Sequence, residues 1–245
     1  LMASLLMFVR LGNRTLWGDE AEVALLAKNV LEFGYPNGYD GEYLVCSECG
    51  DEPETILYKN GYAWRWHPWM MHYLTAASFM LFGINRFAAR FPFAVFGLLS
   101  LVVLYYFTIK LTNNKRLAIL STTLLAFFMP FYLYSRQTRY YSIVMFFSLL
   151  TLYAYLKLIN SEKNSTFWFI LSSILLFYTN YFPFFSIYSA VILHSLIFHK
   201  KAIKKLIISS IFVAAFTLPW FLYASIGSKI AISISGLLFG AAHVS

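Results

Sequence analysis

Acidic side chains are almost absent from this chain outside one short stretch. Ten of its eleven Asp and Glu residues lie between Asp19 and Glu54, and Glu162 is the other one. Charged residues make up 12% of the sequence and hydrophobic residues 60%, which excludes an ordinary soluble domain and predicts a protein that crosses the membrane several times. Ion-coupled transporters usually need ionisable residues inside their spans, so the scarcity of acids after Glu54 disfavours that class.

Cysteine is equally scarce. The two cysteines form the single motif Cys46-Ser47-Glu48-Cys49, which suits half of a zinc site, a redox pair or a local disulfide. Without a second cysteine pair, a metal would need His67, His72 or a carboxylate from elsewhere. We therefore favour a local disulfide or free thiols and assign no metal ligands.

The chain also lacks a complete first span. It begins at Leu1 rather than Met, and the apolar run Leu1–Val9 is too short for the roughly 20 residues that a transmembrane helix needs. We interpret this run as the tail of a first transmembrane helix. The stretch Gly236–Ser245 also breaks off within apolar sequence, so we expect a chain truncated at both ends.

The longer apolar runs predict a bundle of transmembrane helices. A run from Pro68 to Gly83 is short for a span and is bounded by a helix-breaking residue at each end. No repeat or low-complexity tract interrupts the pattern. The better spans are Phe87–Ile109, Leu117–Tyr134, Tyr141–Ile159, Phe167–Asn180 (itself short), Phe184–Phe198 and Leu206–Ile226.

Basic residues in the short loops indicate the orientation. The net charge of +8 therefore does not argue for nucleic acid. Three clusters fall on one side of the bundle, and the positive-inside rule makes that side cytoplasmic. The clusters are Lys110/Lys115/Arg116, Lys157/Lys163 and Lys200/Lys201/Lys204/Lys205.

The run Pro68–Gly83 decides which charged residues can meet. If it crosses the membrane, the acidic segment joins the lysines in the cytoplasm. If it lies in the interface, the acidic segment, Arg136 and Arg139 gather on the outer face, and its length favours this arrangement. We thus expect an all-α polytopic bundle, a single domain over 1–245, with residues 11–83 forming an extracytoplasmic loop that bears amphipathic interfacial helices.

The acidic segment opens an amphipathic helix. From Asp19 the apolar residues Val23, Leu26, Val30 and Phe33 recur at steps of three and four, and Gly34 ends the pattern. Asp19 lies one turn before Val23 and so faces the membrane body, where a carboxylate is costly unless it is used. It can be a helix N-cap, since Glu22 three residues on resembles a capping box, or it can do chemistry. The two roles are compatible.

Two arginines occur in the predicted outer loop against the positive-inside trend. Arg136 and Arg139 can snorkel to lipid headgroups or pair with the acidic segment. They can also clamp a phosphate, because a guanidinium offers planar, bidentate donors to phosphate oxygens. The pattern alone does not separate these interpretations.

Four segments in order resemble the GT-C class of glycosyltransferases, in the branch of the protein O-mannosyltransferases and lipid A aminoarabinose transferases. The resemblance covers about residues 16–155. Its segments are Leu16-Trp17-Gly18-Asp19-Glu20-Ala21 running into Ala27-Lys28-Asn29-Val30-Leu31-Glu32-Phe33-Gly34; His67-Pro68; Leu81-Phe82-Gly83-Ile84-Asn85-Arg86-Phe87-Ala88-Ala89-Arg90-Phe91-Pro92; and Tyr134-Ser135-Arg136-Gln137-Thr138-Arg139-Tyr140-Tyr141, which is similar to the family's Y-S-Q-E-A-R-x-Y.

The resemblance implies a multi-pass cell-membrane enzyme that takes a sugar from a polyprenyl phosphate on the extracytoplasmic side and gives it to a protein, lipid or glycan. It implies a catalytic site at the pair Asp19 and Glu20, with Asp19 as the base. It also implies a place near the lipid phosphate for Arg65 to His67 and for Arg139, helped by Arg136. Gln137 replaces the acid that the family usually has in its loop, which weakens the case for a divalent cation bridging two loops, although a cation remains open. Further candidate substrate-lining residues are Glu22, Gln137 and Tyr141.

The chemistry fits these residue types. Transfer from a phosphate leaving group needs a base for the acceptor hydroxyl and positive charge for the departing phosphate. Asp is ionised at neutral pH with its ordinary pKa of about 3.9 and can act as that base without tuning. We expect a single inverting displacement, with Asp19 activating the acceptor and Arg139 stabilising the phosphate. The competing hypothesis is a non-catalytic protein that binds polyprenyl phosphate or transports a lipid.

Overall fold

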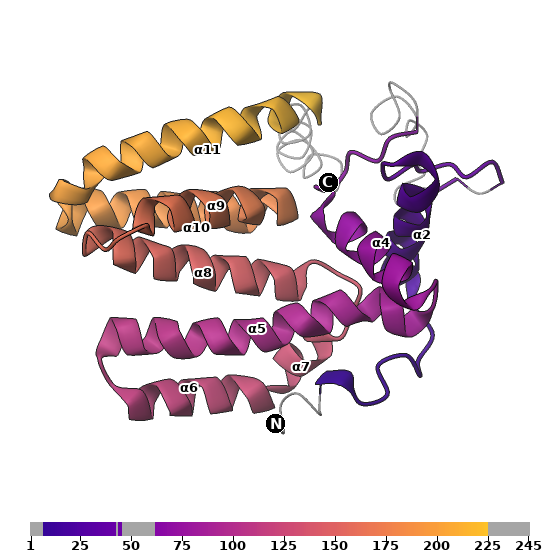
Figure 1. Cartoon of the computed structure of the whole chain (residues 1–245), viewed down its shortest axis with the longest axis horizontal. Helices are drawn as coiled ribbons and strands as arrows, with labels where there is room; N and C mark the ends of the chain where they lie inside the picture. The colour runs from indigo at the N-terminus through magenta and orange to yellow at the C-terminus, as the bar shows by residue number, and fades with distance from the viewer. Residues whose placement is uncertain (1–6, 43, 46–61, 225–245) are drawn as a thin grey trace, which may run out of the picture.

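The computed structural model describes residues 7–42, 44–45 and 62–224, and Figure 1 shows how their helices are arranged. A set of roughly parallel helices forms a bundle, and two further helices lie across one of its ends. The two end helices are α2 (Gly18–Phe33) and α4 (Met70–Phe82). The bundle contains α5 (Arg86–Thr112), α6 (Lys115–Phe127), α7 (Met129–Ser135), α8 (Tyr141–Ile159), α9 (Ser165–Thr179), α10 (Tyr181–Phe198), the short 3-10 turn η1 (Lys200–Ala202) and α11 (Ile203–Tyr223).

The helical bundle confirms the expected all-α polytopic fold. In the described part of the chain, four segments are long and apolar enough to cross a membrane, namely α5, α8, α10 and the segment Lys200–Tyr223 that joins η1 to α11. α9 has 15 residues and is shorter, as its apolar run predicts. Large apolar side chains such as Leu124 and Ile211 remain exposed on the outside of the bundle, as a lipid-facing surface requires.

The expected span Leu117–Tyr134 is bent rather than straight. It is divided into α6 and α7, which meet at Phe128 with a bend of 65°. Pro130 supplies the reason, because inside one helix its ring would clash with the carbonyl four residues earlier and would remove a hydrogen bond. At the second position of α7 the missing N–H costs nothing.

Polar turn residues set the other helix ends. Asn85, Asn114 and Asn180 each accept a hydrogen bond from a backbone N–H in the first turn of the helix that follows. Gly34 ends α2 in the left-handed region at φ 79°, a conformation that glycine adopts without a steric penalty. α2 therefore begins and ends where the sequence predicts.

α4 does not run along the bundle. Its 13 residues span roughly 20 Å, less than the hydrocarbon core of about 30 Å. It packs against α2 and the start of α5, at the end of the bundle where the loop between α7 and α8 also lies. The acidic helix and the two loop arginines therefore share one end of the bundle, as the interfacial interpretation of Pro68–Gly83 requires.

Basic residues gather at the opposite end. The turns from α5 to α6, α8 to α9 and α10 to α11 lie together there (Figure 1). They carry the three lysine-rich clusters found in the sequence, and Lys110 forms an ion pair with Glu162 across two of these turns. The two ends of the bundle thus differ sharply in charge.

Candidate active site

The N-terminus of α2 places two neighbouring acids in different surroundings. The N-cap is Trp17 rather than Asp19, so the expectation that Asp19 caps the helix is wrong. At this end the Oε2 atom of Glu20 accepts a hydrogen bond of 3.4 Å from the backbone N–H of Trp17. Glu20 is 1% exposed, whereas the side chain of Asp19 is 43% exposed.

Glu20 forms a buried ion pair with Arg90 of α5. The Nε and Nη2 atoms of Arg90 donate to Oε1 and Oε2 of Glu20 at 2.8 and 2.6 Å. The backbone N–H of Thr138 donates to the same Oε1 at 2.9 Å. One carboxylate therefore holds the start of α2, the start of α5 and the α7–α8 loop together.

Arg90 also holds the segment that precedes α2. Its guanidinium donates to the backbone carbonyl oxygens of Leu11, Arg14 and Thr15 at 3.1, 2.9 and 3.0 Å. All five N–H groups of Arg90 are thus used. A charge pair buried this deeply is stable only when its hydrogen bonds are satisfied, and here they are.

Asp19 pairs with the second loop arginine. Its Oδ2 atom lies 3.1 Å from Nη2 of Arg139, whose side chain is 11% exposed. The guanidinium also stands over the ring of Tyr140, 5.4 Å from the ring centre. The acid and the arginine expected to act together are therefore in direct contact, and the carboxylate keeps an open side.

Further candidates cluster around this pair. Burial raises the pKa of Glu22, which Arg139 lowers and Asp19 raises, so these three groups lie within electrostatic reach of one another. The ring centres of His67 and Tyr140 are 5.8 Å apart, and those of Tyr140 and Tyr141 are 4.8 Å apart. Burial also raises the pKa of the Tyr140 phenol.

The loop between α2 and α4 positions His67. Backbone bonds tie the segment after α2 to the segment before α4, including a 2.8 Å bond from the N–H of Trp64 to the carbonyl oxygen of Pro36. Trp64 is fully buried beside Leu26 of α2. Cys46 and Cys49 lie outside the described residues.

Arg65 and Arg136 point elsewhere. Arg65 contacts the end of α11, where it donates to the carbonyl oxygen of Tyr223 at 3.5 Å and stacks over that ring. Arg136 donates to the carbonyl oxygen of Val9 at 2.5 Å and stacks over Tyr132. These contacts lie apart from those of Asp19 and Arg139, so the expected grouping of all the arginines around one phosphate does not match the arrangement.

Arg136 instead faces a separate cavity of about 780 Å³. The ion pair of Glu20 and Arg90 forms part of its wall, and Arg14, Arg136 and Gln137 line it with apolar residues of α7. Burial lowers the pKa of Arg136, and the positive charges of Arg90 and Arg14 lower it further. The buried Oε1 atom of Gln137 has no hydrogen-bond partner among the described residues.

His72 of α4 is a candidate that the sequence analysis did not assign to the site. It is fully buried, and neither ring nitrogen has a partner within the described part of the chain. Burial lowers its pKa to about 3, with His67 and Arg139 adding to the effect. In the sequence His72 is an isolated histidine in an apolar run, and this pattern does not predict that it lies near Arg139.

A metal site is not formed by the described residues. Within 7–42, 44–45 and 62–224, no three His, Cys, Asp or Glu side chains are placed to hold one ion. The charged groups at this end are instead organised as two acid–arginine pairs, one buried and one open to solvent.

The fold defines a class of membrane protein. ArnT from Cupriavidus metallidurans, in its crystal structure bound to undecaprenyl phosphate, matches with a TM-score of 0.67 and 16% identity, over 93% of this chain and 41% of that one. Its apo structure matches with a TM-score of 0.65 over the same shares. The likeness shows that the chain shares its fold with part of that protein.

The family follows from the sequence itself. The profile of the dolichyl-phosphate-mannose-protein mannosyltransferase family matches residues 66–224, and the chain belongs to this family. An uncharacterised protein of Aquifex aeolicus (strain VF5) is 27% identical over 165 residues, which is 67% of this chain and 30% of that protein. The chain thus spans less than half the length of these relatives. The resemblance to GT-C glycosyltransferases is confirmed.

Proposed function

We propose that the protein transfers a sugar from a polyprenyl-phosphate donor to a protein, lipid or glycan acceptor on the extracytoplasmic face of the membrane. The contact of 3.1 Å between Asp19 and Arg139 carries the proposal. The carboxylate of Asp19 is open to an acceptor, and the guanidinium of Arg139 beside it is a buried cation that suits a phosphate. Family membership supports the reaction class, and the ArnT structure with undecaprenyl phosphate supports the type of lipid.

The reaction we infer is a single inverting displacement. The acceptor hydroxyl oxygen bonds to the anomeric carbon while the bond from that carbon to the phosphate oxygen breaks. Asp19 takes the hydroxyl proton, and the polyprenyl phosphate leaves with the bonding electrons, which Arg139 stabilises. A positioned base typically contributes about 10²–10⁴-fold. Pre-positioned cations often contribute more where water is excluded.

The ion pair itself gives an order of events. A donor phosphate that binds Arg139 competes with Asp19 for the same guanidinium, so its arrival releases the carboxylate for the acceptor hydroxyl. His67, within electrostatic reach of the site, is the second candidate for contacting the phosphate.

The remaining candidates have supporting roles in this proposal. Arg136 and Gln137 face the adjoining cavity. There they would contact a part of the substrate other than the phosphate that carries the transferred sugar. Arg65 would hold the end of α11 against the site. Glu20 acts by positioning Asp19 and the loop, because its oxygens are already bonded to Arg90, Thr138 and Trp17.

The lysine-rich far end supports an extracytoplasmic site. Cytoplasmic loops carry the excess of Lys and Arg, and the site lies at the other end of the same spans.

The decisive assay is sugar transfer from a polyprenyl-phosphate sugar by the full-length protein in detergent or vesicles. We expect Asp19→Asn to lower kcat by about 10²-fold or more, with donor binding preserved. The matched control is Glu32→Gln, which removes an exposed acid from the last turn of α2. Undiminished turnover in Asp19→Asn would remove the base assignment.

The proposed contact between Arg139 and the donor phosphate is tested by a separate set of variants. Arg139→Ala should weaken donor binding and lower kcat, and Arg139→Lys should recover part of the binding because it keeps the charge without the bidentate fork. Lys28→Gln removes an exposed cation from α2 and serves as the control. Donor affinity unchanged in Arg139→Ala would exclude this arginine as the phosphate ligand. Lipid binding without any product would favour the non-catalytic alternative. Gln137 supports this alternative, because its Oε1 atom has no hydrogen-bond partner in the described part of the chain.

A further inference from the structure

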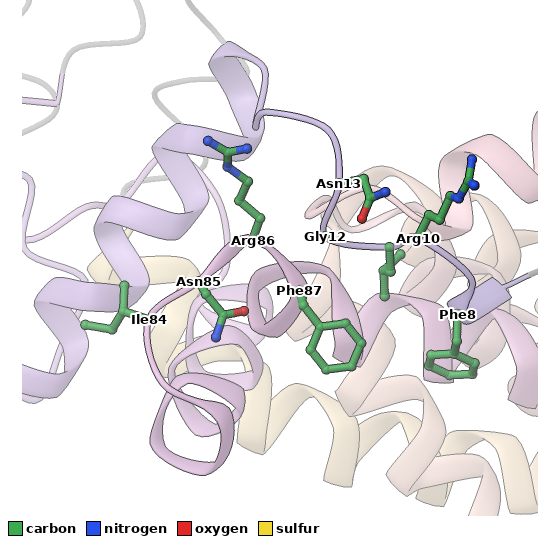
Figure 2. A pocket seen from close by; sticks show the side chains of 9 residues that line it. Phe8, Arg10, Gly12, Asn13, Ile84, Asn85, Arg86 and Phe87 are labelled. Atoms are coloured by element: carbon green, nitrogen blue, oxygen red, sulfur yellow. The ribbon is translucent and has the colours of Figure 1, made fainter.

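A second basic pocket adjoins the cavity that Arg136 faces, with which it shares Arg10, Leu11 and Asn13. It has a volume of about 700 Å³ and sits between the segment before α2 and the start of α5. Figure 2 shows its lining, with Arg86, Asn13 and Arg10 on one side and the rings of Phe87 and Phe8 on the other. Neither Asp19 nor Arg139 lines it.

The polar side of the pocket carries unbalanced positive charge. Arg10 and Arg86 are both exposed, and neither forms an ion pair with a carboxylate of the described residues. The side chain of Asn85 is fully used, because it accepts from Ala88 N–H and donates to the carbonyl oxygens of Phe82 and Gly83. Two exposed guanidiniums without an acidic partner among the described residues suit an anion such as a phosphate.

The other side of the pocket is an aromatic surface. Phe87 contacts Phe82 and Phe91 with ring centres 5.8 and 5.5 Å apart, and Phe8 joins Phe91 at 5.7 Å. Gly12 allows the two walls to meet, because a Cβ atom at this position would lie 3.1 Å from Cβ of Phe87. The pocket is therefore held in shape by packed side chains.

The surface next to the pocket is strongly apolar and suits contact with lipid. Met80 and Leu81 are each 76% exposed and Ile84 is 60% exposed. α5 has 27 residues, roughly 40 Å, and is therefore longer than a hydrocarbon core of about 30 Å. We place Arg86, its first residue, at the depth of the headgroups, because the exposed apolar residues are close to it in the chain.

We propose that this pocket binds the headgroup of an anionic phospholipid. The lipid phosphate lies between Arg10 and Arg86, and the acyl chains run over the phenylalanine surface and Ile84. The apolar side favours a lipid over a free phosphate, and the two unpaired cations favour an anionic lipid over a zwitterionic one. The site holds an annular lipid against the fold. It shares Arg10 and Asn13 with the cavity that Arg136 faces, but neither Asp19 nor Arg139 lines it.

The test is native mass spectrometry of the full-length protein in detergent, titrated with phosphatidylglycerol or phosphatidylcholine. We expect phosphatidylglycerol to bind more tightly. Arg10→Gln and Arg86→Gln should each weaken its affinity about fivefold, and the double variant roughly 20- to 30-fold. Arg86→Lys should retain most of the affinity. The control Lys28→Gln removes one exposed cation from α2 and should leave binding unchanged.

Three outcomes would overturn the proposal. The double variant could retain the wild-type affinity for phosphatidylglycerol, or the wild-type protein could bind both lipids equally. Glycerol phosphate, which has the headgroup chemistry without acyl chains, could displace the lipid at comparable concentrations, and the pocket would then be a site for soluble phosphate. Thermal unfolding of each variant checks the fold, and the single variants decide the question if the double variant does not fold.

Discussion

Asp19 and Glu20 are neighbours in the sequence but differ in what surrounds them. A carboxylate with an open side can accept a proton from a substrate, whereas one whose oxygens are filled by protein donors cannot do so without breaking those bonds. Glu20 belongs to the second kind, since Arg90 and two backbone N–H groups occupy it. We therefore separate a chemical role for Asp19 from a structural role for Glu20.

This separation predicts that substitutions at the two acids change the free energy of unfolding by very different amounts. Glu20→Gln should destabilise the protein by about 3–5 kcal/mol, because it leaves the guanidinium of Arg90 buried without its counter-charge. Asp19→Asn should change stability by at most about 1 kcal/mol, because its pair is open to solvent. Thermal unfolding of both variants in the same detergent measures the difference. Equal destabilisation by the two substitutions would contradict the assignment.

A double-variant cycle isolates the pair. Glu20→Leu combined with Arg90→Met removes both charges, and we expect it to cost less than the sum of the single substitutions, because neither partner is then left as a buried unpaired ion. Additive costs would show that the two side chains do not depend on each other.

The buried histidine predicts a pH dependence. The pKa of His72 is lowered from 6.5 to about 3, so the unfolded chain takes up a proton below about pH 6.5 while the folded chain remains neutral. Stability should therefore fall as the pH drops from 6.5 toward 3, by about 1.4 kcal/mol per pH unit. Unfolding measured at pH 7.5, 6 and 5 tests this, and His72→Leu should flatten the slope. An unchanged slope would exclude His72 as its source.

Several site contacts could not be predicted from the residues alone. Glu20 and Arg90 are 70 positions apart, and no local pattern shows which acid an arginine will meet. Arg136 and Arg139 are three positions apart in a loop that ends one helix and begins another, so no helical period fixes where their side chains point. The need for a counter-charge could be predicted. A lone arginine in the apolar stretch Ala88-Ala89-Arg90-Phe91-Pro92 needs an acid, and the acids lie almost entirely between Asp19 and Glu54.

At the scale of the elements, periodicity and turn residues account for most of the fold. α2, α5 and α8 lie close to their predicted bounds because long apolar runs end at Gly34, Asn113 and Asn160. The division between α6 and α7 was missed because the apolar run continues through it. Pro130 was the available signal, but a proline alone does not decide the matter, because Pro92 and Pro219 lie inside the unbroken helices α5 and α11.

α7 is held against α5 by a close approach at Gly97. A Cβ atom on this glycine would lie 2.6 Å from Cβ of Ser135, at the end of α7. Gly97→Ala should therefore displace α7 and the arginine loop that follows, with a destabilisation of about 1–3 kcal/mol and a loss of sugar transfer. Ser135→Gly removes the clashing atoms, so the double variant should recover both properties. Full activity in Gly97→Ala alone would show that the loop tolerates the shift.

At the scale of the whole molecule, the site lies where separate segments converge at one end of the bundle. α2 contributes the open acid, the α7–α8 loop contributes its arginine, and the segment before α4 contributes His67 (Figure 1). The pair of Glu20 and Arg90 joins these segments and divides this end into the Asp19 side and the cavity that Arg136 faces. A membrane enzyme that joins a lipid donor to a second substrate needs two such approaches to one reactive centre.

The orientation of this end can be tested directly. We expect it to face away from the cytoplasm, because the lysine-rich turns at the other end follow the positive-inside rule. In a full-length background in which every native cysteine is replaced by serine, Cys46 and Cys49 included, the cysteine of Glu32→Cys should react with a membrane-impermeant maleimide in intact cells. A single cysteine at Lys163, in the turn between α8 and α9, should react only after the membrane is permeabilised. The reverse pattern would place the acid–arginine pair in the cytoplasm, where it would meet donor and acceptor on the opposite side of the bilayer, and the extracytoplasmic part of the proposed function would have to be abandoned.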